Sequence, residues 1–168
     1  MNEVKVSIDN QKFKSKPSGD EVRHINSRLV RLVKAFGPKD VRRIAFSIGQ
    51  EGCTFSPATF KNGKRNKDNF EQQQLIALDF DNKDSEKKVS FDEIKERAEH
   101  YELPVLFAYD TLSSSSHDKF RVVFLNDAPI DDRRVAEAVQ MAMGGMFPEA
   151  DPSCYKDVST LYYDGKEI

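Results

Sequence analysis

The chain has 168 residues, of which 38% are hydrophobic and 32% are charged, and its mean hydropathy is −0.64. This length suits one domain. No apolar run approaches the roughly 18 to 20 residues that a membrane span needs, so a transmembrane segment and a signal peptide are excluded. Two cysteines, Cys53 and Cys154, are too few for a disulfide framework or a zinc cluster. We therefore expect no zinc, and we expect the protein to lie in the reducing cytoplasm.

The net charge of −2 hides an asymmetry between the two parts of the chain. Residues 1–70 carry 15 Lys and Arg against 7 Asp and Glu, whereas residues 71–168 carry 11 against 21. A basic part joined to an acidic part suits a protein that holds a polyanion on one side and cations on the other. Two solvated surfaces would give the same composition, so charge alone leaves both interpretations open.

The first 70 residues predict a small, basic α/β module. Ser18 and Glu21 form a capping-box pair, and the helical spacing of apolar residues that follows predicts a helix as far as residue 36. Two strands are expected next, over residues 42–48 and 54–60, on either side of a glycine-containing turn.

A loop over residues 61–67 follows and is the most basic stretch of the chain. We expect its cations to contact the backbone of a nucleic acid, because the acidic part of the chain cannot neutralise phosphates. A solvated hairpin tip is the alternative. The predicted nucleic-acid-binding residues are Lys61, Lys64, Arg65 and Lys67.

Residues 71–168 predict a second module with the element order β-α-β-β-α-β. The expected elements are a strand over 75–81, a helix capped by Ser90 and Glu93, strands over 104–109 and 120–125, a helix capped by Asp131 or Asp132, and a strand over 158–163. This order is that of the ferredoxin-like, RNA-recognition-motif-like topology. The predicted fold class is therefore α+β: a single domain in which residues 1–70 are the smaller N-terminal α/β module and residues 71–168 the ferredoxin-like catalytic unit.

Two carboxylates end the first strand of the second module. Because strand side chains alternate, Asp79 and Asp81 share one face of the sheet. At about 4 Å, two such charges repel by roughly 4 kcal/mol at an effective dielectric constant of 20. No cation follows them before Lys83, so a hard divalent ion, Mg²⁺ or Mn²⁺, is the expected counter-charge. The alternative is a strand that merely runs into an Asp-Asn turn.

The expected topology brings two further segments to the same end of the sheet. The loop with His117 precedes the third strand and the segment with Asp151 precedes the fourth, and both strands should lie antiparallel beside the first. A third carboxylate suits a two-metal site for phosphoryl transfer. Lys119 and Arg121 are cations suited to triphosphate oxygens, or else they lie on an exposed strand face.

Three strings resemble the motifs of the archaeo-eukaryotic primase superfamily, in particular those of the primase-polymerase domains of phages, plasmids and integrative elements. They are Leu75-Ile-Ala-Leu-Asp-Phe-Asp81, Ser115-Ser116-His117 and Ala150-Asp151. The resemblance covers residues 43–164. One departure is Ser159-Thr160, where many such relatives read Ser-Arg, so that a cation is missing.

The resemblance implies a DNA primase/polymerase-type nucleotidyltransferase that joins nucleoside triphosphates on a template during replication of a mobile element or phage. It implies two Mg²⁺ or Mn²⁺ ions held by the catalytic residues Asp79, Asp81 and Asp151. It assigns the nucleotide phosphates to Ser115, His117, Lys119 and Arg121. The implied partners are a nucleic-acid template and primer, nucleoside triphosphates, and a helicase or helical priming domain beyond the C-terminus.

Two other functions share some of these features. Haloacid-dehalogenase-like phosphatases also end a strand in Asp-x-Asp, but they need parallel strands and a later paired-Asp motif, for which Asp131-Asp132 is a poor substitute. A non-catalytic nucleic-acid-binding replication module would keep the sheet, although its acidic triad would repel phosphates. Nucleotide incorporation that a chelator abolishes would separate the three functions.

Overall fold

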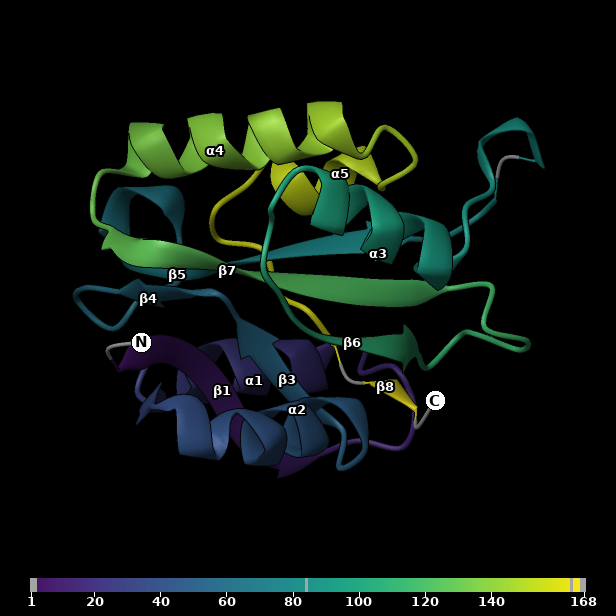
Figure 1. The fold of residues 1–168 in the computed structure, drawn as a ribbon. Helices are drawn as coiled ribbons and strands as arrows, with labels where there is room; N and C mark the ends of the chain where they lie inside the picture. The colour runs from purple at the N-terminus through teal and green to yellow at the C-terminus, as the bar shows by residue number, and fades with distance from the viewer. Residues whose placement is uncertain (1–2, 84, 164, 167–168) are drawn as a thin grey trace.

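The computed structural model describes residues 3–83, 85–163 and 165–166 and shows a mixed α+β fold with two antiparallel sheets, one of them a curled half-barrel (Figure 1). The strands are β1 (Val4–Lys12), β2 (Val33–Phe36), β3 (Cys53–Ser56), β4 (Ala58–Phe60), β5 (Phe70–Phe80), β6 (Val105–Thr111), β7 (Phe120–Ile130) and β8 (Gly165–Lys166). The helices are α1 (Asp20–Leu29), α2 (Val41–Gly49), α3 (Phe91–His100), α4 (Arg133–Met146) and α5 (Pro152–Tyr155), with 3-10 turns η1 (Pro38–Asp40), η2 (Lys67–Asn69) and η3 (Ser85–Lys87).

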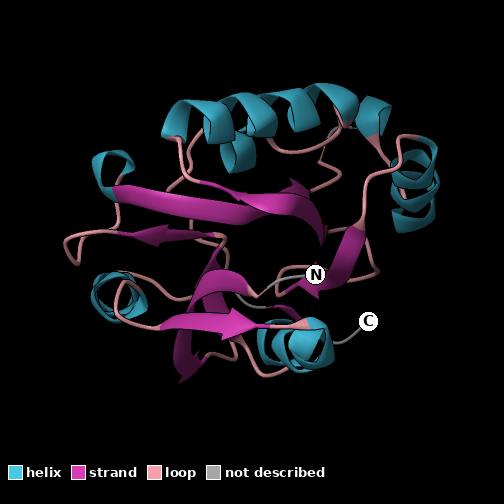
Figure 2. Ribbon diagram, turned by 60° about the vertical axis from the view of Figure 1, so that its left-hand side comes forward, coloured by secondary structure: helices cyan, strands magenta, loops and turns pink. Residues whose placement is uncertain are grey.

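The two sheets have the strand orders β2-β1-β3 and β4-β5-β7-β6-β8. The helices α3, α4 and α5 lie on one side of the five-stranded sheet, and the three-stranded sheet with α1 and α2 lies on the other (Figures 1 and 2). Within the described ranges, each helix is too short or too polar to cross a membrane.

The predicted helix through residue 36 is wrong beyond Leu29, where α1 ends. The residues that follow form β2, which pairs with β1 so that Phe36 lies opposite Val4 and is buried. Tertiary pairing here overrides the helical spacing. The helix begins after Gly19, without a side-chain cap, although the Glu21 carboxylate accepts a hydrogen bond from the Ser18 N–H at 3.3 Å.

The predicted strand over residues 42–48 is also wrong, because this segment forms α2. Ile44, Phe46 and Ile48 alternate as they would in a strand, but Ile44 and Ile48 also have helical spacing. The structure buries Ile44 and Ile48 and leaves Phe46 48% exposed, so Phe46 is not a core residue. The predicted strand over 54–60 does form, but it is split into β3 and β4, which belong to different sheets.

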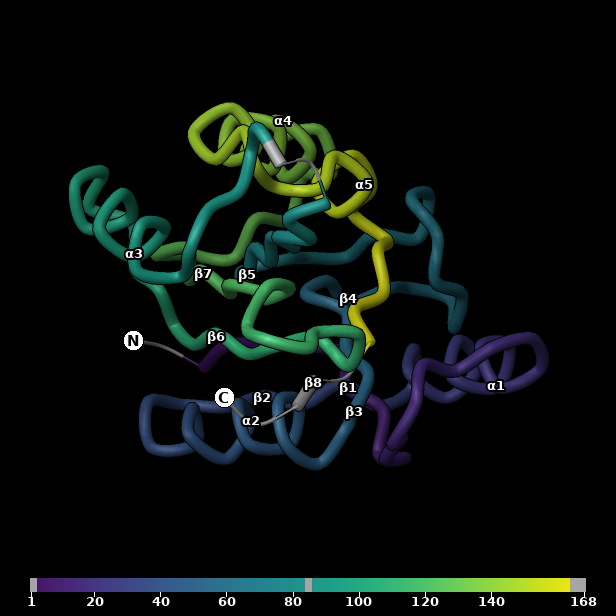
Figure 3. The backbone as a smooth tube through the Cα atoms, turned by 90° about the vertical axis from the view of Figure 1, so that its right-hand side faces the viewer, coloured from purple at the N-terminus to yellow at the C-terminus, as the bar shows by residue number. Residues whose placement is uncertain are grey.

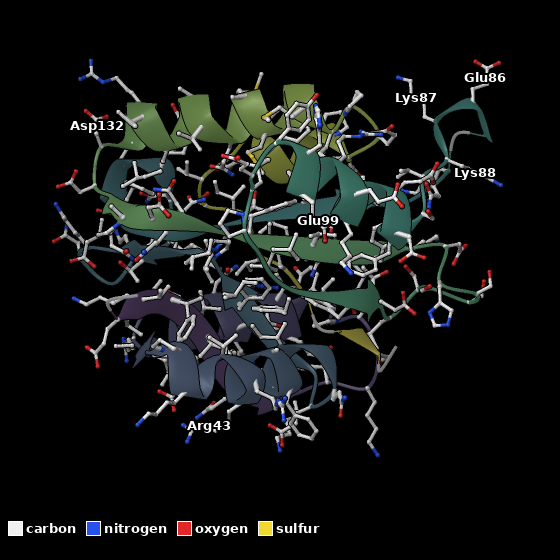
Figure 4. The ribbon with its side chains drawn as sticks, viewed as in Figure 1. Arg43, Glu86, Lys87, Lys88, Glu99 and Asp132 are labelled. Carbon is white, nitrogen blue, oxygen red and sulfur yellow. The ribbon has the colours of Figure 1, made fainter. Side chains whose placement is uncertain are left out.

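In the second module, the strands β5, β6 and β7 and both helices form where they are predicted, although β5 begins at Phe70 and β7 continues to Ile130, beyond the predicted ranges. Both predicted caps are present: Ser90 Oγ accepts from the Glu93 N–H at 3.3 Å, and Asp132 Oδ1 accepts from the Arg134 N–H at 2.8 Å. Figure 4 shows Asp132 at the beginning of α4. As expected, β7 lies antiparallel beside β5.

The expected last strand, over residues 158–163, is wrong. Asp157 Oδ1 accepts from the backbone and the hydroxyl of Ser159, both at 2.8 Å, and this bonding favours a turn. Of the described residues in this segment, Tyr162 alone forms a β-bridge, and its partner is Phe55 in β3. The place beside β5 is taken by β4, so the sheet departs here from the ferredoxin-like order.

One hydrophobic core joins the two predicted modules. Buried side chains of β1 and β3 belong to the same cluster as those of β5 and β7. Phe55 stacks on Tyr162, with ring centroids 5.4 Å apart, and so links the three-stranded sheet to the C-terminal segment. Figure 3 shows this segment, in yellow, running from α5 towards the three-stranded sheet.

Candidate active site

A cavity of about 370 Å³ lies where the end of β5 meets the start of β7 and the C-terminal segment. Its walls come from four parts of the chain that are remote in sequence: the segment after β1, the end of β5, the β6–β7 connection, and residues 151–163. The cavity is therefore built by the tertiary fold and not by any local motif.

The three carboxylates predicted as metal ligands line this cavity together. Asp79 and Asp81 reach it from the end of β5. Asp151 is the N-cap of α5, where its Oδ1 accepts from the Ser153 N–H at 2.9 Å. The backbone N–H of Asp151 donates to the Asp79 carbonyl at 2.8 Å. The structure thus brings together two motifs that lie about seventy residues apart in sequence.

The short helix α5 is held in place by contacts on two sides. A Cβ atom on Gly144 of α4 would lie 2.5 Å from the Tyr155 ring, so this approach needs a residue without a side chain. The Tyr162 hydroxyl lies 2.7 Å from the Cys154 carbonyl and 2.9 Å from the Ala77 carbonyl of β5. These contacts fix the position of Asp151 at the first turn of α5.

Arg121 is the counter-charge of Asp79. The two residues are cross-strand partners in β7 and β5, and the guanidinium Nε and Nη2 donate to the two carboxylate oxygens of Asp79. Its Nη1 donates to the Tyr109 hydroxyl and to the Tyr163 carbonyl, each at 2.6 Å. The guanidinium also lies 4.6 Å from the centroid of the Tyr162 ring.

These contacts change the role expected for Arg121. Burial by itself lowers the pKa of Arg121, but the charge of Asp79, with the contacts to Tyr109, outweighs burial and raises this pKa. With Nε, Nη1 and Nη2 all donating to protein atoms, Arg121 neutralises Asp79 rather than pointing a free guanidinium at a phosphate.

Asp81 has its own cation, because it forms an ion pair with Lys83. The hydrogen bond to Asp81 raises the pKa of Lys83, and the charges of Asp81, Asp151 and Asp79 add to this effect. The sequence-based view of an uncompensated acidic pair is therefore wrong for the structure as described. It failed because Arg121 lies opposite Asp79 in space but is remote from it in sequence.

The three carboxylates of the cavity are suitable ligands for divalent ions by their chemistry, but not by their positions. Three carboxylates offer only oxygen ligands, which suit Mg²⁺ or Mn²⁺. Among residues 3–83, 85–163 and 165–166, however, no group of three or more His, Cys, Asp or Glu side chains is close enough to hold a metal ion. As the side chains lie, the site does not fit an ion, because Arg121 and Lys83 hold two of the three carboxylates.

The predicted phosphate-binding residues are divided between the cavity and its surroundings. Lys119 lines the cavity, but Ser115 and His117 do not. The His117 Nδ1 contacts a carboxylate oxygen of Asp110, which shares its sheet face with Phe120 and not with Arg121. His117 has a φ of +58°, and the Ser115 N–H donates to an Asp118 carboxylate oxygen at 3.1 Å, so local turn geometry holds this loop.

The four cations of the basic loop also differ in their surroundings. Its three lysines are exposed, whereas Arg65 is half-buried. The Arg65 Nε donates to Asn26 Oδ1 of α1 at 2.7 Å, its Nη1 donates to the Ser159 carbonyl, and burial lowers its pKa. Arg65 therefore ties the loop to α1 and to the C-terminal segment. Other cations of this module face outward, such as Arg43 on α2 (Figure 4).

Lys16 is a cavity residue that sequence reasoning missed. It lies between β1 and α1, and its Nζ is 5.8 Å from the centroid of the Tyr163 ring. Nothing in its local sequence distinguishes it from other lysines of the basic module. Only the packing of the first module against the second reveals its position.

Comparisons of the chain with protein-family models, with curated proteins and with solved structures found no match. The likeness to the primase superfamily therefore rests on its three motifs.

Proposed function

We propose that the chain is a nucleotidyltransferase domain of the primase-polymerase kind, which joins nucleoside triphosphates on a nucleic-acid template. The observation that carries this proposal is the meeting of Asp79, Asp81 and Asp151 in one cavity with the cations Lys16 and Lys119. Carboxylates beside cations are the groups needed to hold divalent ions and polyphosphate oxygens together. Replication of a mobile element or phage is the setting that the motifs suggest.

We include a ferredoxin-like catalytic unit in the proposal. Its support is the element order β5-α3-β6-β7-α4, together with the placement of β7 between β5 and β6. The strand β4 stands where the last strand of that topology was expected. A haloacid-dehalogenase-like phosphatase is disfavoured, because β5 is antiparallel to both of its neighbours.

The proposed ligands of Mg²⁺ or Mn²⁺ are the three carboxylates. Arg121 and Lys83 compensate Asp79 and Asp81 in the structure as described, and both contacts would have to open to admit ions. Asp151 has no ion-pair partner among the described residues and needs no such exchange.

The test is incorporation of labelled nucleotides on a single-stranded template, primed and unprimed, with Mn²⁺ and with excess chelator. Asp151→Asn is the decisive variant, because Asn is as good an N-cap as Asp and should preserve α5. Asp132→Asn is the matched control: it makes the same change at the N-cap of α4, away from the cavity.

We expect chelator-sensitive incorporation by the wild type and by Asp132→Asn, and a loss of at least about 100-fold in Asp151→Asn, the scale on which enzymes lose rate when a charge-stabilising group is removed. Absence of incorporation by the wild type on every template would leave a non-catalytic nucleic-acid-binding module. Retention of more than a tenth of the activity by Asp151→Asn would refute the assigned site.

A further inference from the structure

The charged side chains of the cavity do not cancel in pairs. Three carboxylates face four cations, and their formal charges sum to +1. Arg121 is paired with Asp79, and Lys83 with Asp81. Two cations, Lys16 and Lys119, remain without a carboxylate partner among the described ion pairs.

The two remaining lysines come from different modules. Lys119 immediately precedes β7 and is half-buried. It lies two residues before Arg121, so strand alternation places both on the same face of the sheet. Lys16 approaches from the first module, and its ammonium lies by the Tyr163 ring. The backbone carbonyl of Tyr163 accepts from Arg121, so Lys16 and the Arg121–Asp79 pair meet at the same residue.

We propose that Lys16 and Lys119 form a binding site for the phosphate groups of a polyphosphate ligand. The site deepens the proposed function and rests on it, because the polyphosphate would be that of the incoming nucleoside triphosphate. Lys16 adds a cation to the cavity, where Arg121 already donates from Nε, Nη1 and Nη2 to protein atoms. An ammonium on a flexible stem is a compact charge that can follow a phosphate without a fixed fork geometry.

The two lysines have a further consequence. Because no carboxylate holds Lys16 or Lys119 among the described ion pairs, their charges are available to a polyphosphate before any divalent ion is bound. Inorganic triphosphate should therefore bind in the presence of a chelator, and its affinity should depend on Lys16. Neither a nucleobase, nor a template, nor an ion is needed for this measurement.

The experiment is isothermal titration calorimetry of the full chain with sodium triphosphate at low ionic strength in excess chelator. The test variant is Lys16→Ala, and Lys16→Arg is the conservative variant. Lys14→Ala is the matched control, since Lys14 is an exposed lysine of the same segment that does not line the cavity. Lys16 is exposed, so its replacement should leave the fold intact, and thermal unfolding of each variant checks this.

We expect Lys16→Ala to bind triphosphate about fivefold to tenfold more weakly, the scale of one exposed charge-assisted hydrogen bond. Lys16→Arg should stay within about threefold of the wild type, because it retains a cation at the site. Lys14→Ala should stay within about twofold, because it leaves the site untouched. Equal losses in Lys16→Ala and Lys14→Ala would overturn the assignment, as would no loss in either.

This outcome can be told apart from that of the proposed function. Triphosphate binding that depends on Lys16, in a chain that incorporates no nucleotide, would keep the phosphate site and refute the polymerase. Incorporation by the wild type, with an unchanged KM for nucleotide in Lys16→Ala, would keep the polymerase and refute the role of Lys16.

Discussion

Replacing Asp79 by Asn should destabilise the fold, whereas replacing Asp81 by Asn should hardly change its stability. The two carboxylates end the same strand and are almost equally exposed, at 25% and 28% of their side-chain surface. Their partners differ: Arg121 is only 7% exposed, whereas Lys83 is 71% exposed. Mutual repulsion within the acidic pair would instead predict the same neutral or stabilising effect for both variants.

The magnitudes follow from the burial of the partners. Removing one member of a buried ion pair costs about 3 to 5 kcal/mol, and we reduce this to about 2 to 3 kcal/mol because Asp79 is partly solvated. For Asp81, the exposed pair with Lys83 is worth at most about 1 kcal/mol. In a chain of this size, the first change corresponds to a fall of about 5 to 10 °C in Tm.

Equilibrium urea unfolding followed by circular dichroism measures both free energies of unfolding. The double variant Asp79→Asn with Arg121→Met should be less destabilised than the sum of its single variants, because the buried cation is removed along with its partner. If the free energies of unfolding of Asp79→Asn and Asp81→Asn differ by less than about 0.5 kcal/mol, the Arg121–Asp79 pair does not stabilise the fold, because exposed ion pairs alone give changes of this size.

Three further predictions concern the supports of the cavity and the basic loop. Gly144→Ala should destabilise the protein by about 1 to 3 kcal/mol, because the added Cβ meets the Tyr155 ring on α5. The Cβ of Gly145→Ala meets nothing within 4 Å, so this variant should be stabilised by up to about 1 kcal/mol. Thermal unfolding measures both variants, and the reverse order of stability would contradict the described packing of α5 on α4. The exposed lysines of the basic loop are Lys61, Lys64 and Lys67. Replacing all three by Ala should reduce the slope of log affinity for single-stranded template against log salt concentration by about 2, roughly 0.7 for each phosphate that is no longer neutralised, and an unchanged slope would exclude the loop from the interface. Arg65→Ala should mainly lower the unfolding temperature, because Arg65 ties the loop to α1. Burial raises the pKa of the Cys154 thiol from 9.0 to about 12, so its contribution to stability is complete below about pH 9 and is lost as the pH rises towards 12. Between these limits the wild type should lose up to about 1.4 kcal/mol per pH unit more than Cys154→Ala in urea unfolding, and equal losses would contradict the burial of the thiol.

Local chemistry explains which elements could be predicted from the sequence. The caps of α3 and α4 involve residues at most three positions apart, so Ser90 and Asp132 identify these helices without knowledge of the rest of the fold. Residues 33–36 and 42–48 are predicted wrongly, the first because a partner distant in sequence decides their structure and the second because their local pattern is ambiguous. β2 forms because β1 is beside it, and Phe46 supplied a false strand alternation although it is largely exposed.

The same distinction applies to the site. The common face of Asp79 and Asp81 follows from strand alternation. Arg121, the partner of Asp79, could have been found from the register of β5 against β7, which places it opposite that residue. Lys16 could not have been found, because its place depends on how the first module packs against the second.

The β-bridge between Phe55 and Tyr162 affects how the chain folds during its synthesis. Of the described residues, only Tyr162 pairs with the outer edge of β3, and it leaves the ribosome about a hundred residues after Phe55. During that interval the nascent three-stranded sheet has an open edge and an aromatic ring without its stacking partner. Open edges of this kind recruit strands from other chains. Slow translation at high expression should therefore favour aggregation of incomplete chains, and chains that stop before Tyr162 should be the ones found in the insoluble fraction.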